Sequence, residues 1–275
     1  MSQMRSRWHV IRAGNRESPP LVLLHSIATS SALWTLQIPA WSERFRLIVP
    51  DLPGHGLSPV DESIDSLDLY AEELRRLLDD EQAGSVAIVG LSLGGMIAQA
   101  FALRWPDRVR ALVLANSMSR VAPPIRAAWL QRRQAARAQG MASQVWPTLQ
   151  RWFRPEFIKT SPLMMQWVGS MIASVDVGGY LTAISAIQGL DYLDRLTEIR
   201  VPTLVVTGSD DVMVSPVVAA EMAARIPNGE LQVIQSAAHL SNIEQSVAFT
   251  ETVGAFLSYA LSAEAETEPV LRSTP

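Results

Sequence analysis

Short apolar runs, each closed by a turn-forming or polar residue, recur through the first part of the chain and constrain its fold most. They occupy residues 21–24, 47–49, 86–89 and 111–115. An unbroken apolar run of this length is typical of a strand buried on both faces of a parallel sheet. Helical periodicity lies between the runs, over residues 66–78 and 96–103. This alternation predicts right-handed βαβ units, and therefore an α/β protein with a mostly parallel central sheet flanked by helices.

The same alternation returns near the C-terminus, after a middle segment that breaks it. The predicted elements there are strands over 203–206 and 231–234 and helices over 216–225 and 247–261. Residues 120–198, by contrast, have a helical composition and no clear strand. We therefore predict an α/β core from residues 1–119 and 199–262, a helical cap (lid) inserted as residues 120–198, and a disordered tail over 263–275.

Composition excludes several classes of protein. The 275 residues are 48% hydrophobic and 18% charged, which is enough apolar material for a sizeable core and unlike a disordered chain. The net charge of −4 leaves no basic surplus for a phosphate backbone, so we expect no nucleic-acid partner. Cysteine is absent, which excludes disulfides and cysteine chemistry. No signal-peptide pattern or apolar run of roughly 18 residues occurs, so we expect a cytoplasmic protein without a membrane partner.

One short motif points to nucleophilic catalysis. Gly90-Leu91-Ser92-Leu93-Gly94 fits the pattern G-x-S-x-G, in which a sharp turn between a strand and a helix exposes the serine side chain. Glycine suits the flanking positions because a side chain there would collide with the neighbouring elements. An ordinary Gly-rich turn is the alternative. The predicted strand before the motif and helix after it favour Ser92 as a nucleophile.

A serine nucleophile needs a base, and the chain contains four histidines. His9 lies near a first edge strand and is given no role. His55 lies in a tight turn and His25 at a strand end, so we expect both to serve in local packing, with His25 supporting the loop after it. His239 follows the last predicted strand in a loop of small residues, at the sheet edge where open α/β folds bind ligands. We predict that His239 is the base.

An acid and two backbone donors complete the predicted constellation. Asp210 and Asp211 follow the strand over 203–206, and either gives the chain order serine, acid, histidine that is known for such sites. The backbone N–H groups of Leu93, after the nucleophile, and of Ile27, after the first core strand, are predicted to form an oxyanion hole.

At this point the chain resembles the α/β-hydrolase superfamily over nearly its whole length. The resemblance rests on His25-Ser26-Ile27 with Trp34 and on residues 51–58, 90–95, 208–216 and His239. It implies the α/β-hydrolase fold. It also selects Asp211 as the acid, because in the family the acid stands three residues after the glycine that here is Gly208. The family usually has glycine where this chain has Ser26.

Further segments are similar to 3-oxoadipate enol-lactonases. They are residues 112–117, 140–141, 151–157, 179–180 and the long stretch 237–245. The similarity implies hydrolysis of an enol-lactone in aromatic-acid catabolism through an acyl-enzyme, with no cofactor and no metal. A carboxylesterase or a carbon–carbon bond hydrolase acting on a neutral substrate is the alternative, and a non-catalytic ligand receptor on a hydrolase scaffold is a more distant one. Haloalkane dehalogenases and epoxide hydrolases are disfavoured because they need Asp at the position of Ser92.

The predicted cap is expected to determine specificity. Residues 118–171 hold five of the ten methionines and four of the eight tryptophans, a composition typical of an adaptable apolar pocket, although packing of the cap explains most of them equally well. We expect Trp129 and Trp152 to bind substrate, and Arg132 or Arg154 to pair with an anionic group unless they are surface residues. The expected partner is a small-molecule ester or lactone. The sequence indicates no oligomeric state.

Overall fold

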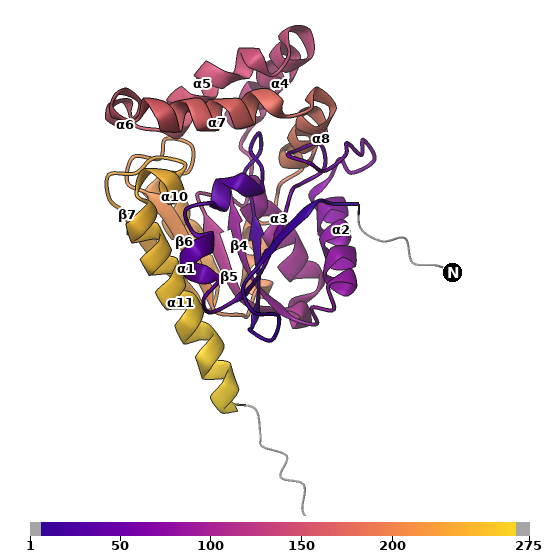
Figure 1. Cartoon of the computed structure of the whole chain (residues 1–275), viewed down its shortest axis with the longest axis vertical. Coiled ribbons are helices and arrows are strands. Elements are labelled where there is room, and N and C mark those ends of the chain that lie inside the picture. Colours follow the sequence, from indigo (N-terminus) through magenta and orange to yellow (C-terminus); the bar gives the residue numbers. More distant parts are fainter. Residues whose placement is uncertain (1–6, 268–275) are drawn as a thin grey trace, which may run out of the picture.

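A seven-stranded sheet forms the centre of the protein (Figure 1). The computed structural model describes residues 7–267, with side chains up to residue 262. The strand order is β1-β3-β2-β4-β5-β6-β7; β1 runs antiparallel to β3, and the other neighbours are parallel. The strands are β1 Val10–Ala13, β2 Pro20–Leu24, β3 Arg46–Pro50, β4 Val86–Leu91, β5 Val109–Ala115, β6 Thr203–Gly208 and β7 Gly229–Ile234. The predicted α/β class with a mostly parallel sheet is confirmed.

Burial follows the position of each strand in the sheet. All residues of the central strands β4 and β6 are buried, as their unbroken apolar runs predict. The edge strand β7 is different, because most of its residues are exposed or half-exposed, including Leu231 at 38%. The core therefore lies around β2 to β6, and it places the carboxyl ends of these strands next to one another.

Helices cover both faces of the sheet. On one side α1 Ile38–Trp41 packs on α11 Ser246–Thr267, where the rings of Trp34, Trp41 and Phe249 lie 6.1 to 6.4 Å apart. The other side carries α2 Leu67–Asp80 and α3 Leu93–Arg104 (Figure 1). Helix α9 Pro216–Arg225 packs on β6 and β7. Helix α11 continues to Thr267, so the prediction of a disordered tail from residue 263 is wrong for its first part; residues 268–275 lie outside the described residues.

Five helices between β5 and β6 form a separate layer over one end of the sheet (Figure 1). They are α4 Pro123–Gln139, α5 Ala142–Trp152, α6 Pro155–Thr160, α7 Pro162–Ser174 and α8 Val177–Gln188, and we call them the helical insertion. Arg120 and Asp191 close its base through a backbone bridge and an ion pair of 2.5 Å. Gly54 and Gly179 let the backbones of the core and the insertion touch, since a Cβ on Gly54 would lie 2.4 Å from Cα of Gly179.

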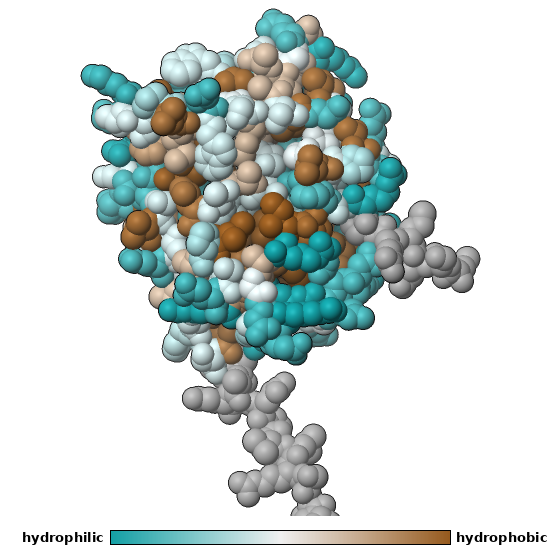
Figure 2. Space-filling model, viewed as in Figure 1, coloured by the Kyte–Doolittle hydropathy of each residue, from teal (hydrophilic) through white to brown (hydrophobic). Residues whose placement is uncertain are grey.

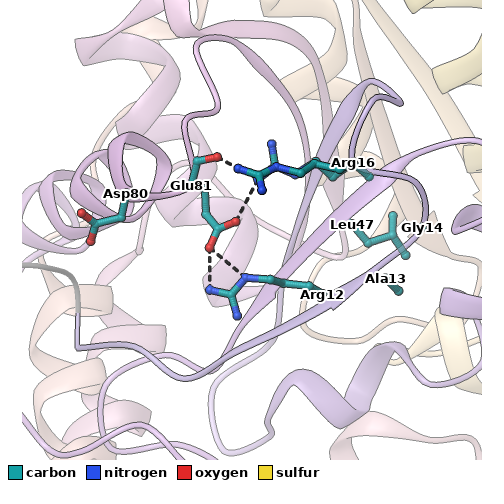
Figure 3. Close-up of a pocket in the computed structure, with 8 residues that line it drawn as sticks. Arg12, Ala13, Gly14, Arg16, Leu47, Asp80 and Glu81 are labelled. Carbon is teal, nitrogen blue, oxygen red and sulfur yellow. Dashed lines mark hydrogen bonds and ion pairs between the residues drawn. The ribbon is translucent and has the colours of Figure 1, made fainter.

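One buried carboxylate ties the end of α2 to two strands. Glu81 accepts hydrogen bonds from Nε of Arg12 on β1 (2.9 Å; Figure 3) and from Nη2 of Arg46 on β3 (2.9 Å). Burial disfavours the charge of Glu81, but the two guanidinium groups outweigh that effect and hold its pKa below the ordinary value. The antiparallel edge strand β1 is thereby fixed to the rest of the core.

The surface mixes polar and apolar residues. Figure 2 shows hydrophobic residues interspersed among hydrophilic ones on the viewed face. Large exposed apolar side chains include Trp146 and Leu163 of the helical insertion. Among residues 7–267, no single helix is long and apolar enough to cross a membrane, and α7 and α8 meet that criterion only as a pair bent by 91°.

Two buried histidines stabilise the loops that follow β2 and β3. Nε2 of His25 accepts the N–H of Leu52 (2.9 Å), and its Nδ1 lies 2.8 Å from the carbonyl of Ser26. Nδ1 of His55 lies 2.9 Å from the carbonyl of Pro53, and the two rings are 5.4 Å apart. Burial lowers the pKa of both histidines, to about 3 for His55. Both rings therefore stay neutral in the folded protein and act as packing elements.

We predict that stability falls on mild acidification because of these histidines. The unfolded chain binds a proton at each below pH 6.5, whereas the folded protein does not, so stabilisation is complete above pH 6.5 and is lost as the pH falls. The expected contribution of His55 is up to about 1.4 kcal/mol per pH unit. Urea unfolding between pH 7 and 4.5 should show a shallower decline for His55→Asn, which keeps a donor for Pro53. An equal slope in both proteins would contradict the prediction.

Candidate active site

Ser92 lies at the sharp turn from β4 into α3, in a backbone conformation that few residues other than glycine adopt. Its φ is 54° and its ψ −111°, which costs of order 1–3 kcal/mol and persists only where the surroundings enforce it. Its N–H donates to the carbonyl of Ala115 at the end of β5 (2.9 Å), and its carbonyl accepts from Oγ of Ser117 (2.9 Å). The end of β5 and the loop that follows it therefore hold both the N–H and the carbonyl of Ser92.

Glycines allow this turn to pack directly on its neighbours. A Cβ on Gly94 would lie 2.1 Å from the carbonyl oxygen of Leu24, the last residue of β2. A Cβ on Gly90 would lie 2.3 Å from the carbonyl oxygen of Gly94. The G-x-S-x-G pattern is thus explained by contacts between β2, β4 and the first turn of α3.

His239 and Asp211 form a buried pair at the carboxyl ends of β7 and β6. Nδ1 of His239 lies 2.9 Å from Oδ2 of Asp211, and both side chains are at most 1% exposed. The other oxygen, Oδ1, accepts the backbone N–H groups of Met213 (2.8 Å) and Val214 (3.0 Å). Burial opposes the charge of Asp211, but the histidine and hydrogen bonds that include the one from Val214 outweigh it and lower its pKa. Asp210, the other candidate, is exposed and accepts a hydrogen bond from the hydroxyl of Ser209.

Asn116 is a polar member of this cluster that the sequence analysis did not single out. Its Nδ2 donates to Oδ2 of Asp211 (2.9 Å), and its Oδ1 accepts from the hydroxyl of Ser241 (2.6 Å). The side chain is fully buried, and the φ of 45° turns the backbone at the end of β5. A polar residue directly after a buried strand was the available signal, because the carboxyl ends of adjacent parallel strands share one edge.

Ser92 and His239 line the same cavity, whose volume is about 320 Å³. Nε2 of His239 is buried and makes no hydrogen bond to another described residue. The wall is mainly apolar and includes Met96, Met118, Ile125, Met213 and Val214. A hydroxyl and an imidazole nitrogen therefore border one apolar space, which is the arrangement that transfer of an acyl group requires.

The two predicted oxyanion donors come from adjoining segments. Leu93 is the first residue of α3, where a backbone N–H has no acceptor within the helix. Ile27 is buried in the loop after β2, whose turn is closed by a hydrogen bond from the N–H of Thr29 to the carbonyl of Ser26. The close contact of Gly94 with Leu24 brings these two segments together.

Two arginines of the helical insertion carry uncompensated charge at the cavity wall. Arg132 stacks on the ring of Trp129, 4.5 Å from its centroid, and Arg151 donates to the hydroxyl of Thr148 (2.9 Å). Neither guanidinium pairs with a carboxylate of the described residues, and Nε of Arg151 is buried without a partner there. Burial lowers the pKa of both, to about 10 for Arg151, where the nearby charge of Arg132 adds to the effect. The position of Arg151 at the cavity was not predicted from the sequence.

The other predicted substrate-binding residues do not line this cavity. Within the described residues, the cavity wall includes Trp129 and Arg132 but neither Trp152 nor Arg154. Trp152 is buried with its ring 6.3 Å from that of His239. Arg154 instead forms an ion pair with Glu244. Arg154 therefore does not line the cavity as predicted, because its charge is already paired with the buried carboxylate of Glu244.

A metal site is not found in the part of the chain that the structure describes. Over residues 7–267, no group of three or more His, Asp or Glu side chains is placed to hold a metal ion. The clustered polar groups are instead those around Ser92, Asp211 and His239.

Comparison with known proteins agrees with this architecture. Residues 19–246 match the family described as alpha/beta hydrolase fold. A 3-oxoadipate enol-lactonase of Acinetobacter baylyi is 28% identical over 89% of this chain and 90% of its own length. The crystal structure of an enol-lactonase from Burkholderia xenovorans is 30% identical, with a TM-score of 0.87 over 91% of this chain and 96% of that one. A thermophilic esterase from Thermogutta terrifontis, with malate bound, is 26% identical, with a TM-score of 0.87 over 92% and 93%.

We predict that Gly94→Ala destabilises the protein strongly. The added methyl group would lie 2.1 Å from the carbonyl of Leu24, so β2 and α3 must separate, at a cost of about 3 kcal/mol or more. Gly84→Ala is the matched control, because Gly84 has no neighbouring atom within 4 Å of an added Cβ, and it should change stability by less than about 0.5 kcal/mol. Urea denaturation measures both, and equal stabilities would contradict the packing argument.

Proposed function

Because the chain belongs to the alpha/beta hydrolase fold family and its relatives hydrolyse ester and lactone bonds, we propose that it acts on such bonds through Ser92, His239 and Asp211. The observation that carries the proposal is the common cavity of Ser92 and His239, with His239 bonded to Asp211. In this proposal the helical insertion is the cap that closes the site and selects the substrate.

Acylation would proceed by attack of the Ser92 hydroxyl on the acyl carbon. The hydroxyl proton passes to Nε2 of His239 while the carbonyl electron pair moves onto the oxygen. Asp211 fixes the tautomer that leaves Nε2 free and stabilises the imidazolium that forms. The N–H groups of Ile27 and Leu93 stabilise the oxyanion, an effect worth about a hundred- to a thousand-fold in rate for one such donor.

Collapse of the tetrahedral intermediate breaks the bond to the leaving oxygen. That oxygen receives the proton from His239, and in a lactone it stays tethered to the acyl group that is now bound to Ser92. Water then attacks the acyl-enzyme, gives a proton to His239, and releases the carboxylic acid as the proton returns to Ser92. One water is consumed per bond, and these steps use only groups of the chain, the substrate and that water.

The substrate that fits this cavity best carries a carboxylate besides the scissile group. Arg132 and Arg151 are half-buried and border the cavity without carboxylate partners of the described residues, and a partly desolvated cation gains when an anion joins it. A guanidinium binds a carboxylate through two parallel hydrogen bonds. An anionic enol-lactone of the 3-oxoadipate type satisfies these conditions, and the similarity to two enol-lactonases supports it.

Hydrolysis of a neutral ester is the second candidate. The apolar wall with Met96, Met118 and Ile125 suits an uncharged acyl chain, and one of the similar structures is an esterase. The two candidates share the Ser92 chemistry and differ in whether Arg132 and Arg151 contribute to binding.

We expect Ser92→Ala to lower hydrolysis of 3-oxoadipate enol-lactone and of 4-nitrophenyl butyrate by about 10⁴-fold or more, because the nucleophile is gone. Ser170→Ala, on the exposed side of the insertion, is the control and should keep wild-type rates. Circular dichroism and thermal melting establish that the variants are folded. Retained turnover by Ser92→Ala would refute the mechanism, and ligand binding by a wild-type protein without turnover would favour a receptor.

We further expect Arg132→Met and Arg151→Met each to lower kcat/KM for an anionic substrate by about tenfold or more, because each removes a charge-assisted hydrogen bond. Mono-4-nitrophenyl glutarate and 4-nitrophenyl butyrate form a matched pair of anionic and neutral esters. The neutral ester should change by less than about threefold, and Arg126→Met, at an exposed position of α4, should affect neither. Unchanged kcat/KM for the anionic ester would instead support the neutral-ester candidate, and equal losses on both esters would contradict recognition of the substrate charge.

A further inference from the structure

Glu244 lies behind the histidine loop and makes every one of its contacts away from the cavity. Its Oε2 accepts the backbone N–H of Ala238, the residue before His239, at 2.9 Å. Its Oε1 accepts from Nε of Arg154 at 2.9 Å and, more weakly, from the backbone N–H of Arg154 at 3.4 Å. The side chain is fully buried, whereas that of Arg154 is 25% exposed. One carboxylate thus joins the histidine loop to the start of α6.

A second connection runs between the same two segments. The carbonyl of Trp152, at the end of α5, accepts the N–H groups of both His239 (3.0 Å) and Leu240 (3.2 Å). The rings of Trp152 and His239 lie 6.3 Å apart at an angle of 31°. Three successive N–H groups, those of Ala238, His239 and Leu240, therefore bond to Glu244 or to Trp152.

From these contacts we infer that Glu244, held by Arg154, is a positioning residue for His239, and that the helical insertion sets the rate of turnover through it. The inference rests on the function proposed above. It gives the insertion a role beyond selecting substrate, because Arg154 and Trp152 are residues of the insertion. It also gives a role to Arg154, which does not line the described cavity.

The physical basis is the precision that proton transfer requires. His239 must bring Nε2 within about 3 Å of the serine hydroxyl, and small displacements of a catalytic group cost large factors in rate. Asp211 fixes the orientation of the ring through Nδ1, but the backbone of the loop determines the position from which the His239 side chain extends. Without an ion pair to Arg154, the buried Glu244 carboxylate would move toward water or take up a proton, and the loop would lose its fixed acceptor.

Two variants test the inference. Glu244→Gln keeps an oxygen for the N–H of Ala238 but turns an amide donor toward Arg154, and Arg154→Met removes the partner at a less buried site. Each should lower kcat for 4-nitrophenyl butyrate by about tenfold with KM changed by less than about threefold. Because the two residues act as one unit, the double variant should be no slower than the slower single variant. Unchanged kcat, multiplicative losses, or losses confined to KM would overturn the inference.

The reaction of Ser92 with phenylmethylsulfonyl fluoride supplies a readout that does not depend on ester binding. It needs His239 as base, so both variants should react about tenfold more slowly than the wild type. Asp191→Asn breaks an exposed ion pair with Arg120 at the base of the insertion and should react at the wild-type rate. A wild-type protein that neither reacts nor hydrolyses esters would refute the proposed function itself. A reactive wild type with equally reactive variants would refute only the positioning role.

Discussion

The strained backbone of Ser92 depends on tight packing between the first turn of α3 and the ends of β2 and β5. The turn exists because Gly94 rests against the carbonyl of Leu24 while the N–H of Ser92 is bonded to Ala115. Neither contact is local in sequence: each forms only once the parallel sheet has brought three strands into register. The conformation that places Ser92 at the cavity is therefore a property of the assembled sheet, and the same strand register positions the elements around the site.

Polar groups around the cavity fall into two kinds, and the difference indicates their use. The Asp211 carboxylate receives four donors, from His239, Asn116, Met213 and Val214, so it is fully satisfied by the protein and serves to orient. Arg132 and Arg151 lie at the cavity wall without a carboxylate of the described residues to balance them. A group that the fold satisfies holds geometry, whereas a half-buried charge that the fold leaves unbalanced is available to a ligand.

The sequence predicted most of the core, because strands buried on both faces leave an apolar signal that needs no knowledge of their partners. It also pointed to Ser92 and His239, which line the cavity, and to Asp211, which is bonded to His239, since all three lie in turns or loops that follow strands of one sheet. The sequence predicted the cavity residues of the helical insertion less well. Helical periodicity shows that a segment is a helix but not which side faces the cavity, so Arg154 was expected there and Arg151 was missed. Asn116 was missed because its role depends on the neighbouring strand β6, which lies far away in sequence.

The insertion meets the core at two functionally different places. Helix α4 and the end of α5 supply Trp129, Arg132 and Arg151 to the cavity, whereas the segment from Trp152 to Arg154 holds the histidine loop. Arg151 and Trp152 are adjacent in the chain, so a shift of α5 that repositions the cationic wall also moves the carbonyl that binds His239 and Leu240. Substrate recognition and placement of the base are therefore, on the proposals above, linked at a single helix end. On the proposals above, a change in the insertion that alters the preferred substrate should alter the turnover of every substrate as well.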